Sequence, residues 1–344
     1  MLGEPKIQFL LTRVALTSGA QKPSATKPNQ RLKVHWAEKG TKTKNQYRSF
    51  AVTVCAGLIL LLAATINARA QYIYTTLSVP GASSTHALGI SGNNIVGYYN
   101  GAGGIHGFLY NGSSYTRLDY PGSSETEAFG ISGNNIVGFC YPGIGYAAGF
   151  LYNGSSYKTL SVPGAVSTTA TGISGNNIVG TYYGGISSAG FLYNGSRYTT
   201  FGVPGARNTF AYGISGTNIV GYCNNASGYQ GFLYNGSTYT TLYGPGGVNA
   251  WACGIDGTNI VGYYNNGGGY QGFLYNGSTY TSLSVPGGAG TYAWGISGNN
   301  IVGYYNIGGT TYGFLATPVP EPSALALLPL GAAILTLRRK TLPP

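Results

Sequence analysis

Residues 74–114 read YTTLSVPGASSTHALGISGNNIVGYYNGAGGIHGFLYNGSS, and closely similar copies of this stretch follow one another along the chain. The copies begin at Tyr74, Tyr115, Tyr157, Tyr198, Tyr239 and Tyr280. A period of 41 or 42 residues indicates a repeat protein, whose units bury their apolar faces against one another. The repeat therefore decides the fold class before any single residue is considered.

Each copy contains four short runs rich in Tyr, Thr, Val, Ile and Phe, bounded by Gly, Asn, Pro and Ser. This composition is typical of strands joined by turns, and no stretch is long enough for a helix. In the first copy the expected strands are Tyr74–Val79, Ala87–Ser91, Ile95–Asn100 and Gly107–Asn111. Four strands per copy match one blade of a β-propeller, and six copies lie within the usual four to eight blades. The sequence predicts an all-β, six-bladed β-propeller spanning residues 71–318.

Turn lengths predict how the strands are shared between blades. The short Asn111-Gly112 turn favours a hairpin, so the fourth strand of one copy should pair with the first strand of the next. The last copy ends at Leu315 without such a partner, and the strand at Tyr74 precedes the first copy's inner strand. We therefore expect the N-terminal strand to close the ring by completing the last blade. The alternatives are a calcium-binding β-roll, which would need Gly/Asp nonapeptides, and a parallel β-helix, which usually has shorter coils.

The net charge of +11 is confined to the two ends of the chain. Eleven Lys or Arg residues lie in residues 1–70 and three lie at 338–340, whereas the repeat region carries four basic and four acidic residues. A nucleic-acid interface requires a concentrated basic surface. The neutral repeats therefore exclude nucleic acid as the expected partner.

The N-terminal region has the layout of a secretory signal. Residues 1–48 form a long basic segment, which is either a natural n-region or the result of a start codon assigned too early. An apolar run within residues 49–70 follows, and it ends in a small-x-small motif. We expect cleavage between Ala70 and Gln71, with Ala68 as the other small residue. An uncleaved membrane anchor is the alternative.

Residues 319–344 form a three-part C-terminal segment. It comprises Val319-Pro320-Glu321-Pro322, an apolar stretch over 324–337, and the basic cluster Arg338-Arg339-Lys340. This arrangement resembles the PEP-CTERM sorting signal of exported bacterial proteins. The resemblance implies transient insertion in the membrane, processing by an exosortase-type enzyme as partner, a cell-surface or extracellular destination and an association with exopolysaccharide. A plain C-terminal anchor is the alternative.

The repeats also resemble the HAF family of extracellular repeats. The stretches that carry the resemblance are Ala128-Phe129-Gly130-Ile131-Ser132, Ile136-Val137-Gly138 and His106-Gly107-Phe108-Leu109. The match covers nearly all of residues 72–315, although Ser, or Asp256 in one copy, stands where the family has Asn. The resemblance implies an exported bacterial protein and supplies no catalytic residue and no cofactor.

Variable residues are confined to the stretches after Pro-Gly and after Val-Gly-Tyr-Tyr, which should share one face of the propeller because strands alternate in direction. Aromatic rings there could stack on sugars in an uncharged site, as in a lectin, although packing within the strands is the simpler interpretation of most tyrosines. The candidate ligand residues are Tyr98, Tyr99, Tyr182, Tyr183, Trp251, Tyr263, Tyr264, Trp294, Tyr304 and Tyr305. We predict a non-catalytic interaction role, with exopolysaccharide or envelope proteins as partners.

The repeat region offers few groups for catalysis or metal binding. A glycosidase needs two carboxyl groups at a defined separation, and Glu125, Glu127 and Asp119 are the clustered candidates. Glu125 and Glu127 are expected to be solvated in a variable loop. A metal site from His86, His106 and Asp119 is conceivable but not expected. The cysteines at 140, 223 and 253 are interpreted as packing residues, although a disulfide between the last two is an open alternative.

Overall fold

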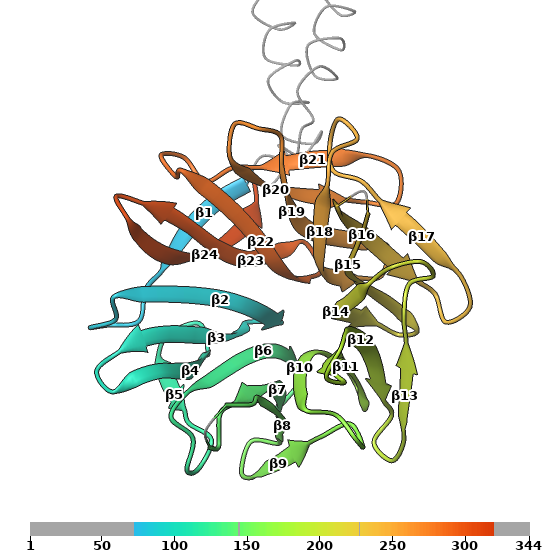
Figure 1. The fold of residues 1–344 in the computed structure, drawn as a ribbon. Coiled ribbons are helices and arrows are strands. Elements are labelled where there is room, and N and C mark those ends of the chain that lie inside the picture. The colour runs from blue at the N-terminus through green and yellow to red at the C-terminus, as the bar shows by residue number, and fades with distance from the viewer. Residues whose placement is uncertain (1–71, 144, 227, 320–344) are drawn as a thin grey trace, which may run out of the picture. The chain divides into compact units, whose positions relative to one another are not determined.

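The structure is a computed structural model that describes residues 72–319, apart from Ile144 and Ser227. In this part of the chain, 24 strands form six four-stranded antiparallel sheets around a central axis (Figure 1). This confirms the predicted six-bladed β-propeller. The described residues contain no helix that could cross a lipid bilayer. The expected signal segments (1–48 and 49–70) and the sorting segment after Val319 lie outside the described residues.

Each blade runs from an inner strand at the axis to a fourth, outermost strand. Blade 1 is β2 (Ser84–Ser91), β3 (Asn94–Gly101), β4 (Gly104–Tyr110) and β5 (Tyr115–Leu118). Blade 2 is β6 (Thr126–Ser132), β7 (Asn135–Cys140), β8 (Ala148–Tyr152) and β9 (Tyr157–Leu160). Blade 3 is β10 (Ser167–Ser174), β11 (Asn177–Tyr183), β12 (Ser188–Tyr193) and β13 (Tyr198–Phe201). Blade 4 is β14 (Asn208–Ser215), β15 (Asn218–Asn225), β16 (Gly228–Tyr234) and β17 (Tyr239–Leu242). Blade 5 is β18 (Ala250–Asp256), β19 (Asn259–Asn265), β20 (Tyr270–Tyr275) and β21 (Tyr280–Leu283). Blade 6 is β22 (Gly290–Ser297), β23 (Asn300–Ile307), β24 (Thr310–Pro318) and β1 (Tyr72–Leu77).

The N-terminal strand closes the ring as expected. β1 pairs antiparallel with β24, from Tyr72 opposite Pro318 to Leu77 opposite Gly313. Figure 1 shows β1, at the blue end of the colour range, beside the orange-red strands of blade 6. Leu77 is 3% exposed and packs in the same cluster as Phe108 of blade 1. One strand therefore completes the last sheet and fills the core of the first blade.

A recurring phenylalanine forms the centre of each blade's apolar packing. These six side chains are at most 2% exposed, and they are Phe108, Phe150, Phe191, Phe232, Phe273 and Phe314. The Ile-Val pairs of the second strands, Ile95 and Val96 in blade 1, are also buried. Burying a large aromatic side chain contributes about 2–3 kcal/mol of hydrophobic stabilisation. The recurring Phe-Leu and Ile-Val motifs are therefore explained by packing.

Backbone-to-side-chain hydrogen bonds join each blade to the next. Gly92 N donates to Ser297 Oγ at 3.3 Å, which links blade 1 to blade 6. The equivalent glycine of every other blade donates to the Ser or Asp that ends the inner strand of the preceding blade. The six bonds close a circle around the axis. This contact explains why a short oxygen acceptor recurs after each Gly-Ile pair, with Asp256 as the one carboxylate.

Alternating strand direction gives the propeller two different faces. The β3–β4 hairpin, the β5–β6 connection and their equivalents lie on one face, which we call the loop face. The β2–β3 and β4–β5 turns and their equivalents lie on the opposite turn face. Nine large apolar or tyrosine side chains are exposed among the described residues, and seven are on the loop face: Tyr146, Val166, Tyr183, Ile186, Tyr229, Tyr243 and Ile307. The loop face is the chemically distinctive surface.

Candidate functional site

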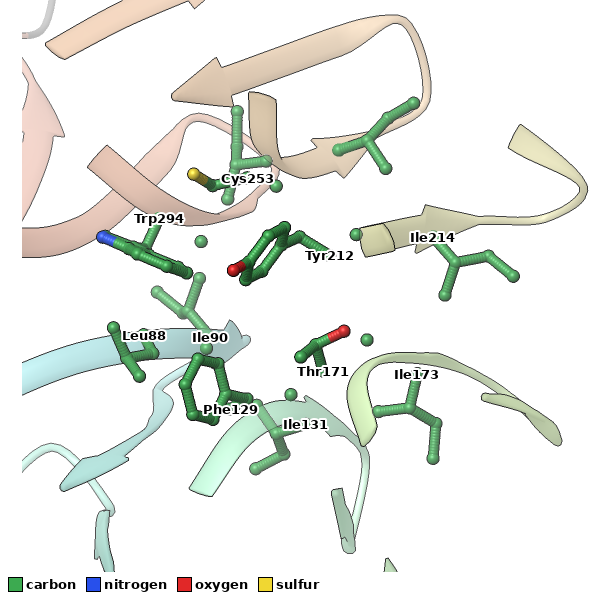
Figure 2. Close-up of a pocket in the computed structure, with 18 residues that line it drawn as sticks. Leu88, Ile90, Phe129, Ile131, Thr171, Ile173, Tyr212, Ile214, Cys253 and Trp294 are labelled. Atoms are coloured by element: carbon green, nitrogen blue, oxygen red, sulfur yellow. The ribbon is translucent and has the colours of Figure 1, made fainter. Parts of the chain in front are cut away.

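A β-bulge in every inner strand turns one side chain toward the axis. In β2 the pairing with β3 shifts between Ala87 and Gly89, so Leu88 has no cross-strand partner. The bulge residues of the six blades are Leu88, Phe129, Thr171, Tyr212, Cys253 and Trp294. Figure 2 shows Phe129, Tyr212 and Trp294 pointing toward one another at the centre.

These bulge residues fill most of the central channel. The ring of Trp294 lies 5.3 Å from that of Tyr212 and 6.0 Å from that of Phe129, measured between centroids. A cavity of about 70 Å³ remains at this level of the axis. A cavity of this size holds a few water molecules and is small compared with the usual sites for organic ligands.

Close aromatic pairs, three of them stacked and one tilted, lie on the inner two strands of four blades. Two positions before each bulge residue, a side chain on the inner strand faces its cross-strand partner on the second strand. Ring centroids within the pairs are 4.4–5.2 Å apart, which is a normal stacking distance. The pairs are His86–Tyr98, Phe210–Tyr222, Trp251–Tyr263 and Tyr292–Tyr304.

The four pairs touch one another across the blades and form what we call the aromatic belt. His86 of blade 1 meets Tyr304 of blade 6 at 4.7 Å between ring centroids. Tyr292 of blade 6 meets Tyr263 of blade 5 at 5.1 Å, and Trp251 meets Tyr222 of blade 4 at 6.4 Å. The belt therefore runs without interruption from blade 4 through blades 5 and 6 to blade 1.

A cavity of about 510 Å³ opens beside the belt between blades 4, 5 and 6. Its lining residues are Tyr222, Tyr229, Trp251, Tyr263, Tyr270, Tyr292, Tyr304, Asn306 and Thr311. Tyr229, Tyr270 and Thr311 are first or second residues of their strands, directly after the loop-face hairpins, so the cavity belongs to the loop face. The lining combines ring faces with hydroxyl and amide groups and contains no charged side chain.

Two buried nitrogen atoms at the belt have no hydrogen-bond partner among the described residues. They are Nδ1 of His86 and Nε1 of Trp294. The ring of Trp294 at the axis also approaches the belt, with its centroid 6.3 Å from that of Tyr304 and 6.2 Å from that of Tyr263. Burying an unpaired polar group costs free energy, so such atoms are uncommon and mark places where a ligand or water can bind.

The structure brings five of the ten candidate ligand residues together. Tyr98, Trp251, Tyr263 and Tyr304 belong to the belt, and Trp294 lies against it. Tyr99, Tyr182, Tyr264 and Tyr305 follow the second-strand belt position, and their side chains pack in the apolar clusters of the blades instead. Tyr183 is 38% exposed at the end of β11, away from the belt.

Sequence reasoning missed several members of the site. His86, Phe210 and Tyr292 lie on inner strands, and Tyr229 and Tyr270 lie at the start of third strands. The predicted residues come from the stretches next to the recurring motifs, where neighbouring tyrosines look alike in sequence. The alternation of side chains along each strand could have separated Tyr98 from Tyr99, and it also points to position 86 opposite Tyr98.

Blades 2 and 3 interrupt the belt. At the equivalent positions, blade 3 has Thr169 opposite Thr181, and blade 2 has Glu127 opposite Phe139. Glu127 was expected to be solvated in a loop, and this expectation is wrong, because the residue lies within β6 and is only partly exposed. Burial, and to a lesser extent the neighbouring Glu125, raises the pKa of the Glu127 carboxyl to about 7.

The other candidate chemical groups have structural roles. His106 Nδ1 lies 2.9 Å from Asp119 Oδ1, while His86 belongs to the belt, so these three side chains do not form one cluster. Asp119 also faces Arg117, with its Oδ2 2.5 Å from Nε. No group of three His, Cys, Asp or Glu residues able to hold a metal occurs in the described part of the chain. Cys223 and Cys253 are buried free thiols, as is Cys140.

His86 and Glu127 should give the stability of the propeller opposite pH dependences that nearly cancel. Burial lowers the pKa of His86 to about 4, so protonation favours the unfolded chain and stability falls as pH drops from about 6.5 to 4. Because the pKa of Glu127 is raised, its deprotonation favours the unfolded chain and stability falls as pH rises from about 4.5 to 7. We estimate about 2 kcal/mol for each group, after allowing for partial exposure.

Single substitutions should reveal the two slopes. His86→Phe, which copies Phe210 of blade 4, should lose about 2 kcal/mol of unfolding free energy between pH 4.5 and 7.5. The unfolding free energy of Glu127→Gln should rise by about as much over the same pH interval. Urea unfolding at several pH values measures both. If the unfolding free energy of each variant varied with pH as that of the wild type does, folding would not shift the pKa of either group.

No family model and no curated protein matches this chain. Among solved structures it is similar to the six-bladed lectin of Aleuria aurantia, with 16% identity, a TM-score of 0.42, and coverage of 73% of this chain and 100% of that chain. It is also similar to the β-propeller domain of the Trilobed protease from Pyrococcus furiosus (7% identity, 71% and 86% coverage, TM-score 0.47). The Trypanosoma rangeli sialidase matches with 8% identity, 75% and 56% coverage and a TM-score of 0.44. Similarities this low assign neither a ligand nor an activity to this chain.

Proposed function

We propose that this protein binds a carbohydrate, without catalysis, through the aromatic belt and the cavity beside it on the loop face. The lining of that cavity carries the proposal. Its volume of about 510 Å³ is typical of small-ligand sites, and its aromatic walls carry hydroxyl and amide groups at the edge. Aromatic faces stack on the apolar faces of sugar rings, while the polar groups satisfy sugar hydroxyls.

The distribution of carboxyl groups favours binding over hydrolysis. Glycoside hydrolysis usually requires two carboxyl groups on opposite sides of the bond that is cleaved. The cavity lining has none, and Glu127 lies on blade 2, outside the lining. A non-catalytic role therefore agrees best with this site.

The ends of the described chain support a role at the cell surface. Tyr72 pairs with Pro318, so both ends leave the propeller side by side on the turn face, opposite the belt. We propose export with cleavage after Ala70 and processing by an exosortase-type enzyme at Pro320-Glu321-Pro322. A tether at either end would then direct the loop face away from the membrane, toward exopolysaccharide or envelope proteins. Mass spectrometry of the exported protein tests this, and a mature chain that does not begin at Gln71 would contradict the proposed cleavage.

Binding to a glycan panel that includes the exopolysaccharide of the producing cell tests the proposed function. Trp251→Ala should weaken binding about tenfold, because a stacked ring contributes on the order of 1 kcal/mol beyond its buried area. Tyr183→Ala is the matched control, since it removes an exposed tyrosine of the same face that lies outside the belt. Both variants must unfold cooperatively. Absence of binding to any glycan, or equal binding by Trp251→Ala, would overturn the proposal.

A further inference from the structure

The aromatic belt continues beyond the cavity. Tyr304 lines the cavity, and its ring meets that of His86 at 4.7 Å. His86 stacks on Tyr98 at 4.4 Å, which carries the belt into blade 1. The next inner-strand position around the ring, on blade 2, is Glu127. A chain-like ligand that follows the rings out of the cavity therefore meets a carboxyl group where the belt ends.

Glu127 has no partner that would neutralise its charge. Within the described residues its carboxyl forms no ion pair or hydrogen bond, and the ion pairs there involve only His106, Arg117 and Asp119. The titratable groups that act on it or feel its charge are the neighbouring Glu125, Tyr98 of β3 and Tyr141 after β7. None of these is a cation. A negative charge on Glu127 is therefore uncompensated and partly shielded from water.

We infer that Glu127 is a specificity-determining residue that excludes anionic glycans from the end of the belt, so that the ligand is an oligosaccharide without acidic groups at that end. This inference rests on the proposed function. A ligand carboxylate near Tyr98 would face the carboxylate of Glu127 across a region with low solvent exposure. Two like charges that approach each other in a partly shielded site repel strongly enough to change affinity on the order of tenfold. Neutral sugar units meet no such barrier.

The discrimination should depend on pH through Glu127 itself. Because burial raises the pKa of Glu127 to about 7, the side chain is charged at pH 8.5 and mostly neutral at pH 5.5. A uronic acid ligand remains ionised at both pH values, since ordinary carboxyl groups titrate near 4. Any loss of discrimination at pH 5.5 would therefore come from the protein and not from the ligand.

The test uses oligogalacturonate and its fully methyl-esterified form, which share one sugar backbone and differ in the methyl group that removes the charge of each carboxyl. With the full-length wild-type protein at pH 8.5, the ester should bind about tenfold more tightly than the acid. The preference should shrink to about twofold or less at pH 5.5 and in Glu127→Gln at both pH values. Glu125→Gln is the matched control, because it removes an adjacent carboxyl yet should keep the preference at pH 8.5.

A second measurement reads the local charge without a glycan. Iodide, which is anionic, should quench the tryptophan fluorescence of Glu127→Gln more than that of the wild type at pH 8.5, whereas neutral acrylamide should quench both equally. Trp294 can report this charge because its ring contacts Phe129, two residues from Glu127 on the same strand.

The outcomes separate the two proposals. Equal binding of acid and ester by the wild type at pH 8.5, or an unchanged preference in Glu127→Gln, overturns the role of Glu127 and leaves carbohydrate binding intact. Failure of both probes and of the whole glycan panel overturns the proposed function. In that case equal iodide quenching of the two proteins would also show that the charge of Glu127 does not reach the belt.

Discussion

Gly97→Ala is expected to destabilise the propeller by about 4 kcal/mol, which is above the usual range for an overpacked site. A Cβ atom at this position would lie 1.9 Å from the carbonyl oxygen of His86 and 2.9 Å from the ring of Phe108. The carbonyl belongs to the backbone of the inner strand and cannot rotate away. Every blade repeats the contact at 1.9–2.0 Å, which explains the glycine after each Ile-Val pair.

Gly184→Ala provides the matched control for that substitution. Its added Cβ would meet only the Tyr182 ring, at 3.9 Å, which is ordinary van der Waals contact. Its unfolding free energy should stay within about 0.5 kcal/mol of the wild type. Urea unfolding followed by tryptophan fluorescence measures both variants. If the two alanines had similar effects, close packing of the inner strands would not be the reason for the recurring glycine.

Removing residues 72–77 is expected to abolish cooperative folding of the ring. The deletion leaves β24 with an unpaired edge, removes Leu77 from the core of blade 1 and breaks the contact of Thr76 Oγ1 with the Tyr305 hydroxyl at 2.9 Å. An open edge also promotes association between chains. Leu77→Ala, a milder change, should cost about 3 kcal/mol. Thermal unfolding and size-exclusion chromatography would measure these effects.

A circular permutant separates loss of ring closure from loss of residues. The chain would begin at Ser84 and continue to Ala316, then pass through Asn-Gly-Ser-Ser into residues 74–83. Tyr74 pairs with Ala316 as Tyr115 pairs with Tyr110, so the linker recreates the hairpin used in blade 1. The permutant should fold with nearly native stability. Its failure to fold would contradict the view that β1 acts mainly by closing the ring.

The architecture could be predicted because it depends on features that are local and repeated. The Asn-Gly turn between Tyr110 and Tyr115 sets a hairpin wherever it occurs, and six similar copies leave few ways to bury their apolar faces. The missing outer strand after Leu315 and the extra strand at Tyr74 then indicated ring closure, which the pairing of β1 with β24 confirms. These inferences required no knowledge of how distant side chains pack.

The candidate site could be predicted only in part, because it depends on contacts between blades. Neighbouring tyrosines such as Tyr263 and Tyr264 look equivalent in sequence, yet one lines the cavity and the other is 4% exposed in the core. The environment of Glu127 was mistaken for the same reason. The residues before it in sequence are polar, whereas Glu127 lies within β6 opposite Phe139 and near enough to Tyr98 of another blade for its charge to raise the pKa of that tyrosine.

The sequence by itself determined the repeat, the strand order, the closure of the ring and the neutrality of the propeller, since each depends on composition and turn chemistry. The tertiary structure alone decided which aromatic rings meet. A bulge in each inner strand changes which side chains face the axis, and closure of the ring brings His86 of the first blade against Tyr304 of the last. The contact between the first and the last blade leaves no signal within one repeat, because it arises only when six blades surround one axis.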